Sequence, residues 1–276
     1  MLISIIIVSH YRREFLMGAL DSVLKQSLSR SNFEIIIVKN FPDAIIDEKI
    51  RDAGCKNILS NDESLGGKLS EAIRACEGEI ICFLEDDDLF HVDKLATVYK
   101  KFTTLTNLGY YHNDFFEIDS NGRENIIEKY FHPLSSFDSV GKNISDNLMM
   151  EYERALIMGY LSTISVRRNV LENISHMLPG LNQYIDTYLF LSNYVQGGRV
   201  LADTKKLTYY RIHQSSSFLM DLDYASFMKK IVSNSIDSVK TFHAMETLQL
   251  SPPLYNYVFA KLVEANITLG LFMRNP

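Results

Sequence analysis

The stretch Ile80-Ile81-Cys82-Phe83-Leu84-Glu85-Asp86-Asp87-Asp88 places an uninterrupted apolar run directly before four consecutive carboxylates. An apolar run without alternation is typical of a strand that is buried on both faces of a sheet. In an open α/β sheet, ligands bind outside the carboxyl ends of the strands. The stretch therefore predicts a central strand that ends at a ligand site.

Short apolar runs and helical patterns alternate through the first half of the chain. Strands are expected at 3–8, 34–38, 57–59 and 79–84. Apolar residues recur at helical spacing between Phe15 and Leu24, and further helices are expected at 69–76, opened by Gly66-Gly67, and at 92–102. This alternation, with its short links, predicts βαβ units and a parallel sheet with right-handed crossovers.

The second half is less regular. Strands are expected at 109–112, 164–166, 200–201 and 207–212, a turn at 119–122 and a helix at 184–194. The segment 124–160 is rich in loops and stays unassigned. From 221 onward two helical patterns follow, separated by Ser251-Pro252-Pro253.

The composition narrows the class of protein and of partner. In 276 residues, 46% are hydrophobic and 22% are charged, which excludes a disordered chain. The net charge of −6 disfavours a nucleic acid as partner, because phosphate contacts need a basic surface. The three cysteines are odd in number and lack metal-binding spacing, which favours the cytoplasm. The apolar run 3–8 is too short for a signal peptide, and no stretch is long enough for a spanning helix.

The four carboxylates at 85–88 allow two interpretations. Like charges packed at a strand end repel one another unless a cation compensates them, and Mg²⁺ or Mn²⁺ with oxygen ligands is the natural choice. Alternatively, the segment is a solvated acidic loop in which Asp88 or Asp93 caps the next helix. The sharp boundary after a fully apolar strand favours the cation.

Five stretches, in order and spacing, resemble family 2 glycosyltransferases of the GT-A fold. They are 4–12, with its loop Ser9-His10-Tyr11-Arg12, followed by 19–26, 34–38, 78–88 and Tyr209-Tyr210-Arg211-Ile212-His213. The resemblance covers roughly 3–217 and implies a Rossmann-like three-layer α/β sandwich with a mixed, mostly parallel central sheet. We expect a GT-A domain over 1–217, with a nucleotide-binding half at 1–112 and an acceptor half at 113–217. A C-terminal helical extension at 218–276 follows it.

The resemblance also implies an activity. The protein would be an inverting, metal-dependent hexosyltransferase that moves a sugar from a nucleoside-diphosphate sugar (UDP, GDP or dTDP) to a hydroxyl of a saccharide or lipid-linked acceptor. Mn²⁺ or Mg²⁺ would be the cofactor. It would neutralise charge on the departing nucleoside diphosphate.

Individual residues take roles from the same resemblance. The nucleotide-sugar would be bound by Ser9, His10, Tyr11, Asn40, Lys68 and Asp86, and the metal ion by Asp87, Asp88 and His213. Which aromatic ring of the first loop stacks on the base stays open. Two of these roles have an alternative. Lys68 stands at the start of a helix, where a surface lysine is nearly as common, and His213 follows a strand, where a histidine is often an ordinary polar residue.

Asp186 would be the general base that takes the proton of the acceptor hydroxyl. Apolar neighbours such as Ile185 and Leu189 would raise its pKa toward the working range. The alternative is an Asp that only stabilises the start of a helix.

Three positions depart from the family pattern. Glu85 stands where the family has Asp, Lys39-Asn40 where it has Asp-Asp, and Ile185 where it has Glu. An amide at position 40 selects a base edge less strictly than a carboxylate, so the identity of the base stays open.

The C-terminal extension carries an apolar stripe at helical spacing, formed by Tyr255, Val258, Phe259, Leu262, Val263 and Ile267. Packing on the main domain, a homodimer through these helices and peripheral contact with the inner face of a membrane all account for such a stripe. A dense basic face, typical of membrane-surface helices, is missing.

Two other functions compete with the transferase. A nucleotidyltransferase would carry a glycine-rich basic loop after the first strand, where this chain has no glycine. A non-catalytic nucleotide-sugar binding module is suggested by Lys39 and Ile185. A dehalogenase-like phosphatase is excluded, because it needs an Asp pair after the first strand.

Overall fold

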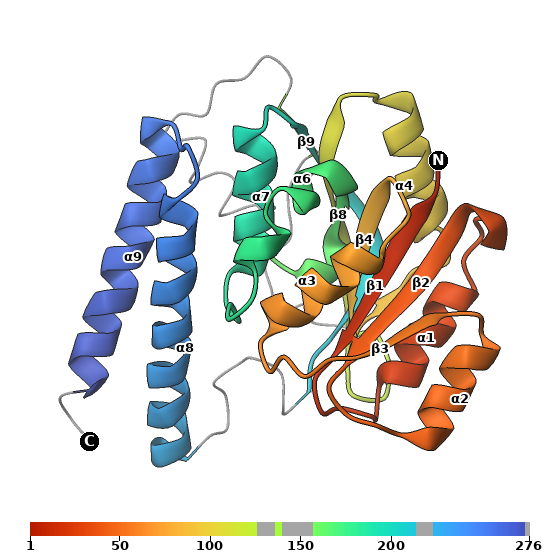
Figure 1. The fold of residues 1–276 in the computed structure, drawn as a ribbon, viewed down its shortest axis with the longest axis horizontal. Coiled ribbons are helices and arrows are strands. Elements are labelled where there is room, and N and C mark those ends of the chain that lie inside the picture. Colours follow the sequence, from red (N-terminus) through yellow and green to blue (C-terminus); the bar gives the residue numbers. More distant parts are fainter. Residues whose placement is uncertain (126–135, 140–156, 214–222, 274–276) are drawn as a thin grey trace.

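One mixed sheet organises the computed structural model, which describes residues 1–125, 136–139, 157–213 and 223–273 (Figure 1). Within these ranges nine strands run in the order β3-β2-β1-β4-β8-β6-β9-β5, and β7 pairs with β9. Their bounds are β1 Ile3–Ser9, β2 Phe33–Lys39, β3 Lys56–Leu59, β4 Ile80–Glu85, β5 Leu89–Phe90, β6 Leu108–Ile118, β7 Phe137–Asp138, β8 Ile164–Arg167 and β9 Arg199–Arg211. The mixed sheet predicted from the sequence is confirmed.

The first half of the sheet is parallel, as the βαβ pattern predicted. β1 pairs in parallel with β2 on one side and with β4 on the other. The register aligns Ser9 with Lys39, and Val8 with Glu85. The carboxyl ends of these three strands therefore reach the same edge of the sheet, where the acidic segment begins.

Helices cover both faces of the sheet (Figure 1). On one face α1 Leu16–Leu24, α2 Ala44–Asp52 and α4 Lys94–Thr104 share a core with Ile3, Ile5 and Ile7 of β1. On the other face α3 Leu65–Ala75, α6 Arg168–Glu172 and α7 Ile185–Val195 share a core with Ile6 and Val8. Alternate side chains of one strand enter opposite cores, which explains its unbroken apolar run. Short 3₁₀ turns lie at η1 Arg30–Asn32, η2 Leu161–Thr163 and η3 Ser175–Met177.

The second half of the sheet mixes directions. β8 is antiparallel to both β4 and β6, whereas β6 and β9 form a long parallel ladder. The sequence predicted two strands at 200–201 and 207–212, but β9 is continuous. The polar segment between them interrupts the apolar pattern, and shifts in the β6–β9 register absorb it.

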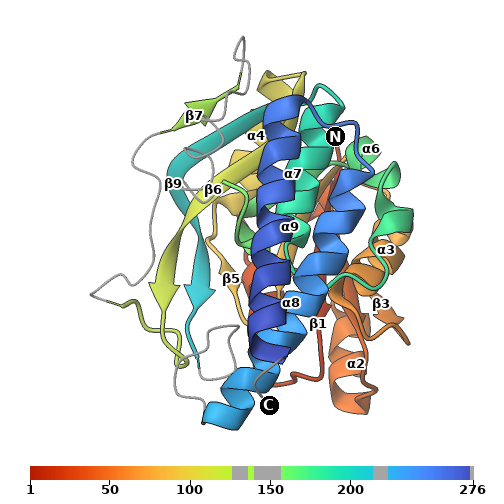
Figure 2. The ribbon, with the colours of Figure 1, turned by 90° about the vertical axis from the view of Figure 1, so that its left-hand side faces the viewer.

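Two long helices, α8 Tyr224–Glu246 and α9 Pro252–Met273, end the described chain, as predicted (Figure 2). Phe242 of α8 and Leu254, Val258 and Leu262 of α9 are buried in the core that also holds α7. The apolar stripe therefore divides. Its other members, Tyr255, Phe259, Val263 and Ile267, are exposed. None of the helices within the described ranges has the length and apolar content needed to cross a bilayer.

Some expectations lie outside the described residues. Most of the unassigned loop-rich segment 124–160 falls there, and so do residues 214–217 at the predicted end of the GT-A domain.

Candidate functional site

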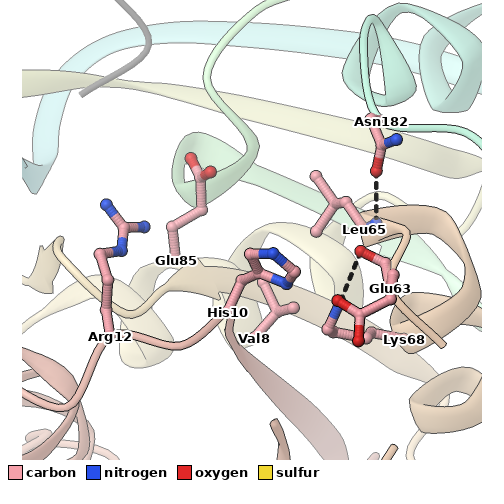
Figure 3. Close-up of a pocket in the computed structure, with 8 residues that line it drawn as sticks. All are labelled: Val8, His10, Arg12, Glu63, Leu65, Lys68, Glu85 and Asn182. Carbon is pink, nitrogen blue, oxygen red and sulfur yellow. Dashed lines mark hydrogen bonds between the residues drawn. The ribbon is translucent and has the colours of Figure 1, made fainter. Parts of the chain in front are cut away.

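A cavity of about 190 Å³ opens where β1 and β4 end and α3 begins (Figure 3). Its lining combines charged and polar side chains with two apolar ones: Val8, His10, Arg12, Glu63, Leu65, Lys68, Glu85 and Asn182. Figure 3 shows Arg12 and Glu85 toward one end, Glu63, Lys68 and Asn182 toward the other, and His10 between them. The cavity lies at the sheet edge that the sequence predicted as a ligand site.

The loop after β1 turns sharply at Tyr11, whose φ of 56° is left-handed. The Tyr11 N–H donates to Asn40 Oδ1 at 3.0 Å, and its hydroxyl donates to Glu63 Oε1 at 2.8 Å. Asn40 Nδ2 also lies 3.1 Å from His10 Nδ1. The turn thus sends the Tyr11 side chain outward, where it is 56% exposed, while the His10 ring lines the cavity.

The start of α3 is held by the protein itself. Leu65 N–H donates to Asn182 Oδ1 at 2.9 Å, Gly66 N–H to Leu181 O at 2.8 Å, and Gly67 N–H to Ser64 Oγ at 2.9 Å. A methyl group on Gly66 would meet Leu178 O at 2.0 Å. Gly66 therefore permits close packing against 178–182, and Gly67 permits close packing against Asp62. The amides of both glycines are engaged within the protein.

Lys68 is fully buried, and its side chain runs along the base of the cavity. Its ammonium donates to the main-chain oxygens of Glu63 at 3.1 Å and Ser64 at 3.2 Å. Desolvation lowers the pKa of Lys68, against the attraction of Glu63. The alternative of a surface lysine is wrong.

Asp86 lies beneath the loop after β1 and is fully buried. Ser9 Oγ lies 2.5 Å from Asp86 Oδ2, and Arg12 Nη2 lies 2.6 Å from Asp86 Oδ1. Burial raises the pKa of Asp86 to about 6, although the charge of Arg12 opposes this. The structure thus joins Ser9 to Asp86, two residues that the sequence placed at the nucleotide.

Asp87 accepts contacts from two distant parts of the chain. Arg12 Nη1 lies 2.5 Å from Asp87 Oδ2, and His213 Nε2 lies 2.9 Å from the same oxygen. Burial alone would raise the pKa of Asp87, but the hydrogen bond from His213 and the charge of Arg12 hold it below its usual range. Asp87 is therefore ionised at neutral pH.

Asp88 has different surroundings. Its Oδ1 accepts the N–H of Arg211 in β9 at 2.9 Å, and the Arg211 guanidinium donates to Asp87 O at 2.7 Å. Burial and the neighbouring charge of Asp87 raise the pKa of Asp88 well above its ordinary value. Asp88 fastens the acidic segment to β9. Asp93 precedes α4 but makes no side-chain cap there, so the capping interpretation fails.

Asp186 stands in the first turn of α7. Its carboxylate accepts the Thr187 N–H at 2.8 Å and a backbone hydrogen bond from Tyr160. Burial raises the pKa of Asp186 to about 6, against these two hydrogen bonds. The sequence predicted a raised pKa for Asp186 from its apolar neighbours, and the structure gives the same direction with burial as the cause.

The turn 160–163 connects Asp186 with the acidic segment. Tyr160 is bonded to Asp186, and Ser162 Oγ, two residues later, accepts the Glu85 N–H at 3.0 Å. The buried ammonium of Lys94 holds this turn from below through the main-chain oxygens of Ser162 at 3.3 Å and Thr163 at 3.2 Å. One short turn therefore contacts both Asp186 and Glu85, the first residue of the acidic segment 85–88.

The residues at Asp87 fit a divalent ion in part. A carboxylate oxygen and an imidazole nitrogen 2.9 Å apart are donors that Mn²⁺ accepts. In the described part of the chain, however, no three His, Cys, Asp or Glu side chains come together around one point. The set Asp87, Asp88 and His213 is thus not assembled, and phosphate oxygens or water would have to complete the coordination.

Sequence reasoning missed three residues of the site. Arg12 contacts both Asp86 and Asp87, Glu63 binds the loop after β1, and Ser162 contacts Glu85. Arg12 lies inside the stretch 4–12 that resembled the family. The adjacent carboxylates of Asp86 and Asp87 need a positive charge nearby, and this was the signal by which Arg12 could have been predicted. Glu63 and Ser162 belong to no motif, and only the fold brings them here.

The sequence of the chain is similar to that of known glycosyltransferases. The model of the family described as "Glycosyl transferase family 2" matches residues 4–158, more than half of the chain. An uncharacterized glycosyltransferase of Nostoc sp. is 26% identical over 237 residues, which cover 79% of this chain and 67% of the relative. One from Rickettsia conorii is 30% identical over 125 residues, which cover 44% of this chain and 20% of the relative.

Solved structures share the fold. Residues 1–349 of Staphylococcus aureus TarS, in complex with UDP-GlcNAc, superpose with a TM-score of 0.63 at 15% identity, over 97% of this chain and 73% of that fragment. The mannosyltransferase PcManGT of Pyrobaculum calidifontis, in complex with GDP-Man and Mn²⁺, gives a TM-score of 0.60 at 12% identity, over 99% of this chain and 75% of that protein. The GT-A fold with C-terminal helices is thereby confirmed. With its matching family model, this chain belongs to glycosyl transferase family 2.

Proposed function

We propose that the protein transfers a hexose, with inversion, from a nucleoside-diphosphate sugar to a hydroxyl of a saccharide or lipid-linked acceptor. One observation carries this proposal: the turn 160–163 contacts both Asp186 and Glu85, and Glu85 lines the cavity and begins the acidic segment that holds Asp87. UDP-GlcNAc and GDP-Man, bound by the two structural relatives, define the donor class to test first.

In this proposal the nucleoside occupies the cavity, with the His10 ring against the base and Asn40 near its polar edge. His10 is among the residues that line the cavity and Tyr11 is not, so His10 is the better stacking partner. Ser9 and Asp86, joined by their hydrogen bond, would hold the ribose. Lys68 contributes positive charge from the base of the cavity.

Asp87 and His213 would hold a divalent ion, Mn²⁺ or Mg²⁺, with Asp88 beside them, bonded to Arg211 of β9. When bound, such an ion stabilises the negative charge of the departing nucleoside diphosphate. The carboxylate oxygen of Asp87 and the imidazole nitrogen of His213 suit such an ion, and the structural relative in complex with Mn²⁺ supports Mn²⁺.

Asp186 acts as general base in a single displacement. The acceptor oxygen forms its bond to the anomeric carbon as the bond to the diphosphate oxygen breaks, and the acceptor proton passes to the Asp186 carboxylate. A buried carboxylate with a pKa near 6 is ionised at neutral pH and still basic enough to take a proton in the transition state.

The test is release of nucleoside diphosphate from UDP- and GDP-sugars in the presence of Mn²⁺ and a panel of hydroxyl acceptors. Acceptor-dependent release supports a transferase. Tight donor binding without turnover over the whole panel would instead support the non-catalytic binding module.

The C-terminal helices add a proposal about partners. α9 exposes Tyr255, Phe259, Val263 and Ile267 along one face, and within Pro252–Met273 its charged residues Lys261 and Glu264 are paired with each other. This face offers no cluster of positive charge to anionic lipid, so a second copy of the chain is the better partner than a membrane. Light scattering after gel filtration tests it, and a monomer at every concentration would contradict it.

A further inference from the structure

Arg12 occupies the position between the two donors that the proposed metal site needs. Its Nη1 lies 2.5 Å from Asp87 Oδ2 and 3.4 Å from His213 Nε2, while Nη2 lies 2.6 Å from Asp86 Oδ1. The guanidinium therefore bridges two adjacent carboxylates, with one nitrogen for each. Charge-assisted pairs of this kind are the strong ones, because donor and acceptor are both ionised and the planar fork fixes their geometry.

The other nearby guanidinium does not share this task. Arg211 directs its donors at main-chain oxygens, those of Asp87, Asp119 and Ser120, rather than at the carboxylates. Arg12 is thus the arginine that compensates Asp86 and Asp87 in this state. Its side chain is still 31% exposed, so it can leave the cluster without disturbing the core.

An ion at Asp87 and a guanidinium at Asp87 exclude each other electrostatically. A metal–oxygen bond is about 2.1 Å long, and Arg12 Nη1 lies 2.5 Å from Asp87 Oδ2. An ion bound to that oxygen would therefore lie at most about 4.6 Å from Nη1. Like charges at that separation in a largely buried site repel strongly. The guanidinium at Asp87 therefore weakens the binding of an ion at that oxygen, and its release would strengthen it.

We propose that Arg12 is a resident counter-ion that keeps the divalent ion out until a diphosphate arrives. Arg12 then moves from Asp87 to the diphosphate, which offers it new anionic oxygens. Because Arg12 loses its carboxylate partner only where a phosphate replaces it, ion and nucleotide bind cooperatively. This inference rests on the proposed metal-dependent function and adds a residue that orders the binding of its two ligands.

The experiment measures Mn²⁺ affinity by the electron paramagnetic resonance signal of the free ion, first without nucleotide. Arg12→Gln is compared with wild type and with the control Arg13→Gln. The control removes the same charge at the next residue, whose side chain is half-exposed and pairs with Asp43. We expect Arg12→Gln to bind Mn²⁺ at least tenfold more tightly than wild type, within the roughly 5- to 150-fold range of typical coupling. Arg13→Gln should stay close to wild type.

The second arm repeats the titration with UDP and with GDP. In wild type the matching nucleotide should raise Mn²⁺ affinity strongly, whereas in Arg12→Gln most of this gain should be gone. Arg12→Lys keeps the charge but loses the planar guanidinium, so its gain in Mn²⁺ affinity should fall between those of wild type and Arg12→Gln. It replaces Arg12→Gln if thermal unfolding shows that the Gln variant does not fold.

The outcomes separate the two proposals. If wild type binds Mn²⁺ with nucleotide, but Arg12→Gln shows no gain in affinity for Mn²⁺ alone, the counter-ion role is wrong and the metal site stands. If neither protein binds Mn²⁺ even with UDP or GDP, the metal-dependent function fails and this inference fails with it.

Discussion

His213 Nε2 lies 2.9 Å from Asp87 Oδ2, although 126 positions separate the two residues in the chain. The short strand β5 creates this contact, because it pairs with β9 in antiparallel register and aligns Leu89 with Tyr209. The acidic segment just before β5 is thereby laid beside the end of β9, where Arg211 also contacts Asp87 and Asp88. Two stretches that resembled the family separately thus meet at one carboxylate.

Asp186→Asn should abolish most turnover while leaving the nucleotide site intact. The amide cannot accept the acceptor proton, so kcat should fall by roughly 100-fold or more. Calorimetry should show an unchanged Kd for the nucleoside diphosphate. Asp21→Asn, at an exposed position on α1, is the matched control and should behave as wild type. Turnover near that of wild type in Asp186→Asn would remove Asp186 from the mechanism.

The pH profile should report the same carboxylate. Burial raises the pKa of Asp186 to about 6, and the base works only when it has lost its proton. The value of kcat/KM should therefore be constant above about pH 7 and fall about tenfold per pH unit well below 6. Nucleotide affinity measured over the same pH range separates loss of the base from loss of binding. A profile that stays flat to pH 5 would contradict this role.

His10→Ala should weaken binding of the nucleoside diphosphate. Loss of one ring from a base stack costs about 1–3 kcal/mol, which corresponds to roughly 5- to 150-fold in Kd. Tyr11→Asn should change Kd far less, because Tyr11 is not among the residues that line the cavity and Asn tolerates its left-handed φ. The reverse order of the two effects would identify Tyr11 as the stacking residue.

Gly66→Ala should destabilise the protein by filling a contact that has no room. The new methyl group would meet Leu178 O at 2.0 Å, so we expect the free energy of unfolding to fall by about 1–3 kcal/mol. Gly270→Ala is the control, because nothing lies within 4 Å of its Cβ position in α9. It should raise stability by about 0.5–1 kcal/mol. Urea unfolding of both variants gives the comparison, and equal stabilities would show that α3 can move away from 178–182.

The central strands could be predicted because burial on both faces leaves a clear trace in the sequence. The apolar runs of β1, β2 and β4 have no other explanation in a chain of this composition. Helix α2 was not predicted, since only Ile46 and Ile50 in it are buried, and Ile45 is apolar but exposed. A helix that covers the sheet with two side chains carries too little periodicity to be recognised.

The site shows the same limit. Asp87 and Asp186 could be named because each stands in a stretch with a recognisable pattern. Other contacts of the site depend on how distant segments pack. They are the bonds of Arg12 to both carboxylates, of Tyr11 to Glu63, and of the turn 160–163 to Glu85 and Asp186. Nothing local in the sequence encodes such contacts, so only the fold reveals them.

The most direct test of the account is calorimetric titration of UDP and GDP into wild type and Asp87→Asn, with and without Mn²⁺. We predict that one of the two nucleotides binds wild type in an Mn²⁺-dependent manner, and that Asp87→Asn loses this dependence and binds at least tenfold more weakly. Nucleotide binding of equal strength in both proteins, with or without Mn²⁺, would contradict the claim that Asp87 holds a cation against a diphosphate.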